Sequence, residues 1–279
     1  MDFPRTTITV AGTLPVRLSA IDIGPTLREP QGAAEPPVPA RGTIVCIHGA
    51  GGQAEQWKFQ IAYFSRHYRV IAPDLRGHGQ SEKPRSAYSL EEFLWDFTQT
   101  LERLKVAEPF ILMAHSFGGP IALTFAASQP QRISKLVLVA TAPEMHLNPF
   151  YEALLKLPLP LRTIDRLKPI LMPNFYAPLF VLQRVLAGTL FPWRGWDLLP
   201  AVQTPTLIIG GQFDFIVPVT ALQRMRAGLP NARLELVRYA RHLPQIERPD
   251  AVNRNIEGFI ERRRSWRGED EDEEARFTA

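Results

Sequence analysis

The feature of this chain that most restricts its fold is a serine, Ser116, between two apolar stretches. The run F-I-L-M at residues 110–113 is typical of a buried strand, and P-I-A-L-T-F at residues 120–125 is typical of a helix. Small residues, Ala114 and Gly118, lie two positions before and after the serine. They are needed there if the chain turns sharply from strand into helix, because a larger Cβ would collide across a strained backbone. The pattern therefore predicts a turn that exposes the serine hydroxyl to a base.

A glycine-rich loop follows an earlier apolar run. The run T-I-V-C-I at residues 43–47 ends in H-G-A-G-G at residues 48–52. Glycines let backbone N–H groups point inward with nothing covering them, so the amides of Ala50 and Phe117 could stabilise a negatively charged oxygen, with the Gly51 amide as an alternative donor. A phosphate-binding loop is disfavoured, because neither the G-x-G-x-x-G nor the G-x-x-x-x-G-K-[ST] spacing is present.

These patterns resemble those of the serine-nucleophile α/β-hydrolases, a family of esterases and lipases. The turn at Ser116 is similar to their G-x-S-x-G motif, with Ala114 in place of the first glycine, and residues 48–52 are similar to their H-G-x-x-G loop. Residues 74–81, D-L-R-G-H-G-Q-S, resemble their D-x-R-G-x-G-x-S loop. The resemblance covers residues 43–259 and implies an α/β fold, with a mostly parallel central sheet, helices on both faces and a helical cap inserted after the sixth strand.

The resemblance implies a catalytic triad in the order serine, acid, histidine. Residues 206–211 form an apolar run, and Q-F-D-F-I-V-P at residues 212–218 is similar to the G-x-x-D-x-x-x-P loop of the family. The acid is then Asp214. Glu144, which follows another apolar run, is an alternative acid, because some members of the fold place their acid at that strand.

The base is expected near the end of the chain. Residues 239–249 are similar to the terminal G-H-x-x-x-x-E-x-P motif of the family, with Arg241 where glycine is more usual, and this makes His242 the base. An inward-facing guanidinium at Arg241 would lower the pKa of His242, whereas an outward-facing one would have little effect. The other histidines are expected to pack or to fix loops, or carry no motif: His48, His67, His78, His115 and His146. In the loop at residues 74–81 we expect Asp74 and Arg76 to bind loop backbone.

The three triad candidates together predict acyl transfer. His242 would take the proton of the Ser116 hydroxyl during attack, and Asp214 would hold the imidazole in the productive tautomer. The expected product is an acyl-serine, and the expected enzyme is a carboxylesterase acting on small to medium hydrophobic esters. The same groups serve thioester hydrolysis, perhydrolase chemistry and carbon–carbon bond hydrolysis in aromatic degradation. A non-catalytic binding module on this fold is the alternative of another class, and epoxide hydrolases and dehalogenases are disfavoured because they use an aspartate nucleophile.

The stretch least similar to the family motifs is residues 143–199, which we predict to be the helical cap on a core formed by residues 1–142 and 200–268. Its composition is rich in aromatic and aliphatic residues, which implies an apolar roof over the site. Four of them are predicted to bind substrate beside Gly51: Phe175, Tyr176, Phe180 and Trp193. A membrane span over residues 170–193 is disfavoured, because prolines interrupt it, although weak interfacial contact stays open.

Composition limits the partners. The formal net charge of +4 over 279 residues is modest and its carriers are scattered among acids, so we expect no nucleic-acid partner. The single cysteine, Cys46, rules out an intramolecular disulfide, and we expect neither a metal nor another cofactor. The first residues lack the features of a signal peptide, which predicts a cytoplasmic protein. Residues 269–279 form an acidic tail that we expect to be disordered, and the oligomeric state is left open.

Overall fold

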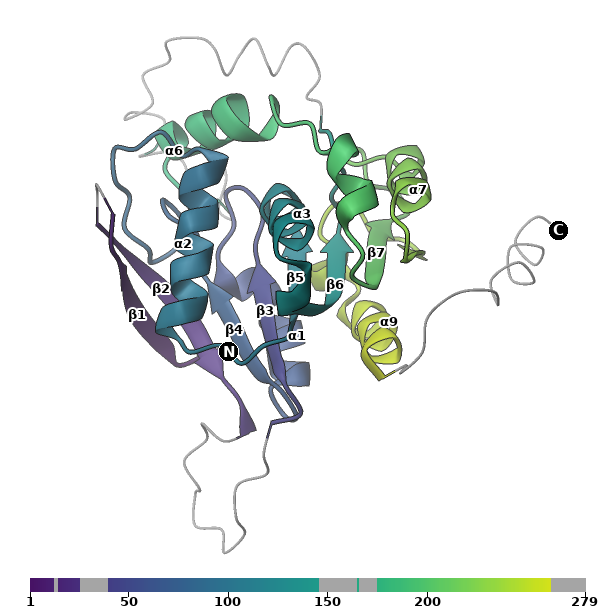
Figure 1. Ribbon diagram of the computed structural model, residues 1–279, viewed down its shortest axis with the longest axis horizontal. Coiled ribbons are helices and arrows are strands. Elements are labelled where there is room, and N and C mark those ends of the chain that lie inside the picture. Colours follow the sequence, from purple (N-terminus) through teal and green to yellow (C-terminus); the bar gives the residue numbers. More distant parts are fainter. Residues whose placement is uncertain (13–14, 26–39, 146–164, 166–174, 262–279) are drawn as a thin grey trace, which may run out of the picture.

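One eight-stranded sheet organises the protein (Figure 1). The structure is a computed structural model that describes residues 1–12, 15–25, 40–145, 165 and 175–261. The strand order is β1-β2-β4-β3-β5-β6-β7-β8; β2 is antiparallel to both β1 and β4, and the remaining neighbours are parallel. The strands are β1 (Arg5–Val10), β2 (Val16–Ile23), β3 (Thr43–Ile47), β4 (Arg69–Pro73), β5 (Phe110–His115), β6 (Ile133–Val139), β7 (Thr206–Gly211) and β8 (Ala232–Val237).

Helices cover both faces of this sheet. In Figure 1, α2 and α3 lie in front of the strands. The helical segments are the short turns η2 (Ala54–Trp57), η3 (Pro130–Arg132), η4 (Val185–Leu190) and η5 (Trp196–Ala201), and the helices α1 (Lys58–Phe64), α2 (Leu90–Arg103), α3 (Gly118–Ser128), α6 (Leu179–Arg184), α7 (Val219–Gly228), α8 (Pro244–Glu247) and α9 (Pro249–Glu261). This arrangement confirms the predicted fold class.

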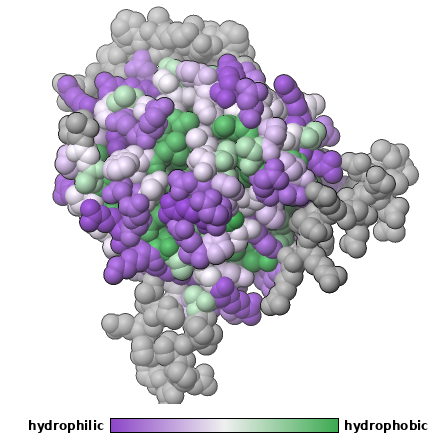
Figure 2. Space-filling view, in the orientation of Figure 1, coloured by the Kyte–Doolittle hydropathy of each residue, from purple (hydrophilic) through white to green (hydrophobic). Residues whose placement is uncertain are grey.

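The core has two main layers because successive residues of a strand face opposite sides of the sheet. In β3, for example, Val45 and Ile47 pack with α2 and α3 on one side, whereas Ile44 and Cys46 pack with α1 and α9 on the other. All five residues of this strand are buried. Figure 2 shows that polar residues cover most of the viewed face, with hydrophobic residues visible in small areas near its middle.

Helix α2 illustrates how local sequence sets an element. It begins with a capping box, in which the Ser89 hydroxyl accepts from the Glu92 amide at 3.3 Å and the Glu92 carboxylate accepts from the Ser89 amide at 3.1 Å. Its apolar residues Phe93, Phe97 and Leu101 recur every four positions and are buried against the sheet.

The segments that carry the domain predictions are only partly described. Residues 146–164, 166–174 and 262–279, and with them about half of the predicted cap and the whole acidic tail, lie outside the described residues. Within the described part of the chain, every helix is too short or too polar to cross a bilayer. The division into core, cap and tail stays a prediction.

Candidate active site

The turn at Ser116 joins β5 to α3. Ser116 has a φ of +48°, in the left-handed region that a serine rarely adopts, and it is held there by its amide, which donates to the Val139 carbonyl at 3.0 Å. A Cβ at Gly118 would come within 2.9 Å of the Ile47 carbonyl oxygen, so only glycine allows α3 to start this close to β3. The predicted strand–turn–helix is therefore present, with Ser116 at its tip.

The structure brings Ser116, His242 and Asp214 into one line of hydrogen bonds. His242 Nε2 lies 3.0 Å from Ser116 Oγ, and His242 Nδ1 lies 2.9 Å from Asp214 Oδ2. The three residues follow β5, β8 and β7, whose carboxyl ends lie at one edge of the sheet. The His242 side chain is 20% exposed, whereas Ser116 is 7% exposed and the Asp214 side chain is fully buried, so the line reaches solvent mainly at His242.

Asp214 is held as a carboxylate. Its Oδ1 accepts from the amides of Ile216 at 2.8 Å and Val217 at 3.0 Å, which leaves Oδ2 for His242. Burial alone would raise the pKa of this carboxyl, but the hydrogen bonds from His242 and from the two amides outweigh burial and lower the pKa. The ionised carboxylate therefore fixes the proton of His242 on Nδ1 and leaves Nε2 free to accept one.

The alternative acid lies elsewhere. Glu144 Oε2 accepts from Trp196 Nε1 at 2.8 Å, and Glu144 Oε1 pairs with Arg194 Nε at 2.6 Å. Both carboxylate oxygens of Glu144 are therefore bound by side chains at or just before η5. The geometry joins His242 to Asp214 and not to Glu144.

The glycine-rich loop lies beside the turn at Ser116, because Ile47 pairs with Ala114 across β3 and β5. The Gly49 amide donates to Gln56 Oε1 at 3.0 Å and the Gly52 amide to the Gly49 carbonyl at 3.0 Å. Among the described residues, no acceptor is found for the amides of the two predicted donors, Ala50 and Phe117. Unpaired amides next to a serine hydroxyl are what an oxyanion-binding site requires.

With this geometry known, comparisons identify the family. A family model described as the alpha/beta hydrolase fold matches residues 42–182, half of the chain. The chain belongs to the α/β-hydrolase family. The uncharacterised hydrolase YugF of Bacillus subtilis is 29% identical over 249 residues, covering 80% of this chain and 91% of the relative.

Solved structures of α/β hydrolases share the fold. Est816, an N-acyl homoserine lactone degrading enzyme, is 26% identical with a TM-score of 0.70, covering 90% of this chain and 99% of its own. A thermophilic esterase from Thermogutta terrifontis is 23% identical with a TM-score of 0.74, covering 92% of this chain and 98% of its own. The resemblance read from the motifs is thereby confirmed.

In this α/β hydrolase, hydrogen bonds from two side chains, Glu247 and His115, hold the backbone around His242 like a clamp. Glu247 accepts from the amide of Arg241 at 2.6 Å and from the amide of Leu243 at 3.2 Å, one with each carboxylate oxygen. His115 Nε2 lies 2.8 Å from the His242 carbonyl, and since a carbonyl only accepts, Nε2 carries the proton. The sequence motif contained Glu247 but indicated no role for it. The Arg241 side chain is exposed, which is the outward arrangement considered above.

Burial keeps the neighbouring histidines neutral. His48 Nε2 accepts from the Leu75 amide at 3.0 Å, so its Nδ1 donates to the Gly49 carbonyl at 2.8 Å and holds the glycine-rich loop. Burial lowers the pKa of His48 to about 4, and burial together with neighbouring charge lowers that of His115 to about 3. Both act as fixed hydrogen-bonding groups, as expected from the sequence.

The predicted cap residues occupy different places. The Phe175 ring lies over Gly51, where a Cβ would come within 2.5 Å of it, and the Tyr176 amide donates to the Gly51 carbonyl at 2.7 Å. Phe180 makes an edge contact with Tyr88 at 6.4 Å between ring centroids. The Trp193 ring lies against Gly195. Neither of the last two contacts includes a residue of the triad, whereas Phe175 and Tyr176 lie at the glycine-rich loop.

The loop after β4 matches the expectation for Asp74 only. Asp74 accepts from the Ala54 amide at 2.7 Å and from the Gln80 amide at 2.8 Å, as expected for a residue that binds loop backbone. The expectation for Arg76 is wrong: its guanidinium pairs with the carboxylates of Asp96 at 2.6 Å and Glu92 at 2.6 Å. The reason is burial, because a buried guanidinium needs carboxylate partners to compensate for its lost hydration.

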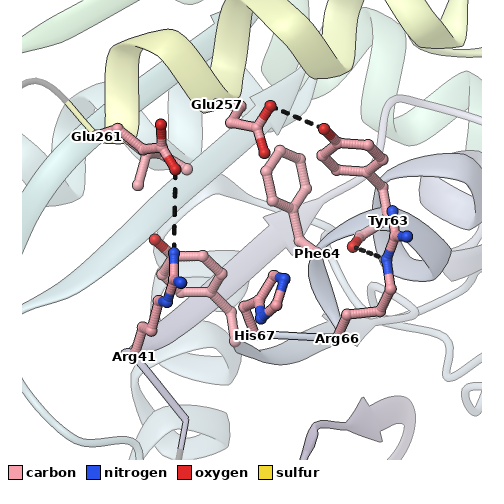
Figure 3. A pocket seen from close by; sticks show the side chains of 9 residues that line it. Arg41, Tyr63, Phe64, Arg66, His67, Glu257 and Glu261 are labelled. Carbon is pink, nitrogen blue, oxygen red and sulfur yellow. Dashed lines mark hydrogen bonds and ion pairs between the residues drawn. The ribbon is translucent and has the colours of Figure 1, made fainter.

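A separate cavity of about 190 Å³ lies near the amino ends of β3 and β4, at the opposite ends of these strands from the triad (Figure 3). It is lined from α1, α9 and the segments that lead into β3 and β4, and its lining includes none of the triad residues. Its two acids have polar partners in the lining: the Tyr63 hydroxyl donates to Glu257 at 2.8 Å, and Arg41 lies 3.9 Å from Glu261. Within the described residues, no group of three or more histidine, cysteine or acidic side chains could hold a metal ion.

Proposed function

We propose that the protein is a serine hydrolase, and more specifically a carboxylesterase that cleaves small to medium hydrophobic esters. The observation that carries the proposal is the hydrogen-bonded line from Ser116 Oγ through His242 to Asp214. A serine hydroxyl is a poor nucleophile by itself, and a histidine base oriented by a carboxylate is the arrangement that activates it.

The proposed reaction proceeds in two halves. His242 Nε2 takes the proton of Ser116 as Oγ attacks the ester carbonyl, and the protonated imidazole is stabilised by Asp214. The negatively charged oxygen of the tetrahedral intermediate accepts hydrogen bonds from the amides of Ala50 and Phe117, with Gly51 as the alternative donor. His242 then gives its proton to the departing alcohol, which leaves an acyl-serine. In the second half water attacks that acyl group by the same route and releases the acid.

Ester substrates are supported by the surroundings of the serine and by similar proteins. The Phe175 ring and the Leu182 side chain lie over Gly51, and residues of this kind favour an apolar acyl or alcohol group over a charged one. Both solved structures named above are of enzymes whose names refer to esters or lactones, which are cyclic esters. We infer that residues 143–199 form the cap over this site and that Phe180 and Trp193 extend its apolar lining.

A series of p-nitrophenyl esters of graded acyl length tests the proposal, with a ring-cleavage diketone beside it. Each methylene buried in an apolar pocket is worth about 0.8 kcal/mol, so kcat/KM should rise up to about fourfold per carbon until the pocket is full. Ser116→Ala should hydrolyse none of the esters. Turnover of the diketone without the esters would instead indicate a carbon–carbon hydrolase, and turnover of neither would indicate a non-catalytic module.

A further inference from the structure

Four large hydrophobic side chains are exposed together on the loops that follow β7 and β8. The exposed fractions are 46% for Phe213, 89% for Phe215, 51% for Ile216 and 66% for Tyr239. Single exposed hydrophobic residues are ordinary on protein surfaces, but a contiguous group indicates a surface that binds something. We call these four residues the aromatic patch.

The patch is contiguous because the two loops are bonded to each other. The Phe213 amide donates to the Ala240 carbonyl at 2.8 Å, and the Tyr239 amide donates to Gln212 Oε1 at 3.2 Å. The rings of Phe213 and Tyr239 lie 6.4 Å apart between centroids. The patch therefore has members from both loops, at the edge of the sheet where Ser116 also lies.

The tip of the first loop is held in shape by the triad acid. Asp214 Oδ1 accepts from the amides of Ile216 and Val217, which bends the chain so that Phe215 stands out at the turn. A fixed, protruding phenylalanine costs little conformational entropy when it inserts into an apolar medium. Asp214 thus orients His242 through Oδ2 and, through Oδ1, fixes the turn that exposes Phe215.

Positive charge lies beside the patch, on the segment that follows β8. Between residues 238 and 248 lie three exposed arginines, Arg238, Arg241 and Arg248, and one acid, Glu247. The carboxylate of Glu247 accepts backbone amides with both of its oxygens, and the guanidinium of Arg248 lies 6.0 Å from the centre of the Tyr239 ring. An apolar surface with arginines beside it is complementary to an anionic lipid surface, where aromatic rings occupy the head-group level and arginines meet phosphate groups.

We propose that the aromatic patch and its arginines bind an anionic membrane surface from one side, with Phe215 inserted among the head groups. A second copy of this chain fits less well, because a symmetric contact would bring the arginines of both copies together. The consequence for substrates rests on the proposed function: hydrophobic esters dissolve in lipid, and docking here brings the end of the sheet that carries the triad to their source. Binding itself needs no reaction.

Sedimentation with vesicles tests the proposal, using the Ser116→Ala protein so that no ester is hydrolysed. The protein should sediment with vesicles of phosphatidylcholine mixed with phosphatidylserine, and far less with phosphatidylcholine alone. Phe215→Ser should lower the partition coefficient about tenfold, and Arg238→Gln and Arg248→Gln about fivefold each. Two exposed residues outside the patch provide matched controls: Trp95→Phe on α2 and Arg226→Gln on α7 should bind as the parent does.

The outcomes separate this inference from the proposed function. Binding of the parent to anionic vesicles with loss in Phe215→Ser supports the inference even if the esterase assay fails. Turnover of a soluble acetate ester without vesicle binding overturns the inference alone. If light scattering shows a dimer that Phe215→Ser dissociates, a second copy covers the patch and the lipid surface is excluded. With Ser116 intact, Phe215→Ser should leave the turnover of soluble acetate esters unchanged.

Discussion

Replacing Asp214 by asparagine should disable the site through the tautomer of His242. The asparagine oxygen must take the place of Oδ1, because that position accepts two backbone amides and an NH₂ group there would face two donors. The NH₂ group then occupies the Oδ2 position, 2.9 Å from His242 Nδ1. Nδ1 must accept, so the ring proton moves to Nε2. An Nε2–H facing Ser116 Oγ cannot take the serine proton.

The magnitude follows from that change of tautomer. Loss of general-base catalysis at this triad position costs on the order of 10⁴ in kcat, or about 5.5 kcal/mol of barrier. KM should change little, since the Asp214 side chain is fully buried and meets no substrate. The measurement is kcat and KM for p-nitrophenyl acetate, with circular dichroism to show that the fold is intact.

Glu144→Gln is the matched comparison. Its carboxylate serves Trp196 and Arg194 away from His242, so kcat should stay within about threefold of the parent. A loss of less than tenfold in Asp214→Asn would refute the tautomer argument. A larger loss in Glu144→Gln than in Asp214→Asn would move the acid to the segment after β6.

Three further predictions concern the surroundings of the triad. Glu247→Gln should lower kcat about tenfold, because its NH₂ group faces a backbone N–H and one charge-assisted bond beside His242 is lost; unchanged kcat would show that the clamp is not needed. Phe180→Ala should shift the preferred acyl length in the ester series while acetate turnover persists, and an identical length profile would place the acyl group elsewhere. Stability in urea should fall progressively below pH 6.5, because burial lowers the pKa of three histidines in the folded protein, His48, His78 and His115, so that the unfolded chain binds more protons. Each histidine contributes up to about 1.4 kcal/mol per pH unit until its folded pKa of about 3 to 4 is reached. A stability profile that is flat from pH 7 to 4 would contradict this prediction.

Much of the candidate site could be predicted because its residues follow apolar strands in a fixed order. Parallel strands end at one edge, so side chains just after β5, β7 and β8 meet although Ser116 and His242 are 126 positions apart. The turn could be predicted from the small residues around Ser116, because close packing against β3 leaves no room for a side chain at Gly118. These are local signals that a single sequence contains.

The partners of buried charges could not be predicted in the same way. Arg76 pairs with carboxylates on α2, and which helix face meets a loop depends on packing that no local pattern records. Glu247 accepts from two amides beside His242 only because α8 brings its last residue back next to the segment that follows β8. Likewise the aromatic patch depends on two loops that meet in space, and neither loop alone distinguishes exposed from buried phenylalanines.

Covalent labelling of Ser116 tests the central claim most directly. A fluorophosphonate reacts with an activated serine hydroxyl, so intact mass should show one adduct on the parent protein, and peptide mapping should assign it to Ser116. Ser116→Ala should remain unlabelled, and Asp214→Asn should label far more slowly. An adduct that persists on Ser116→Ala, or that maps to another residue of the parent, would contradict the assignment of Ser116 as nucleophile.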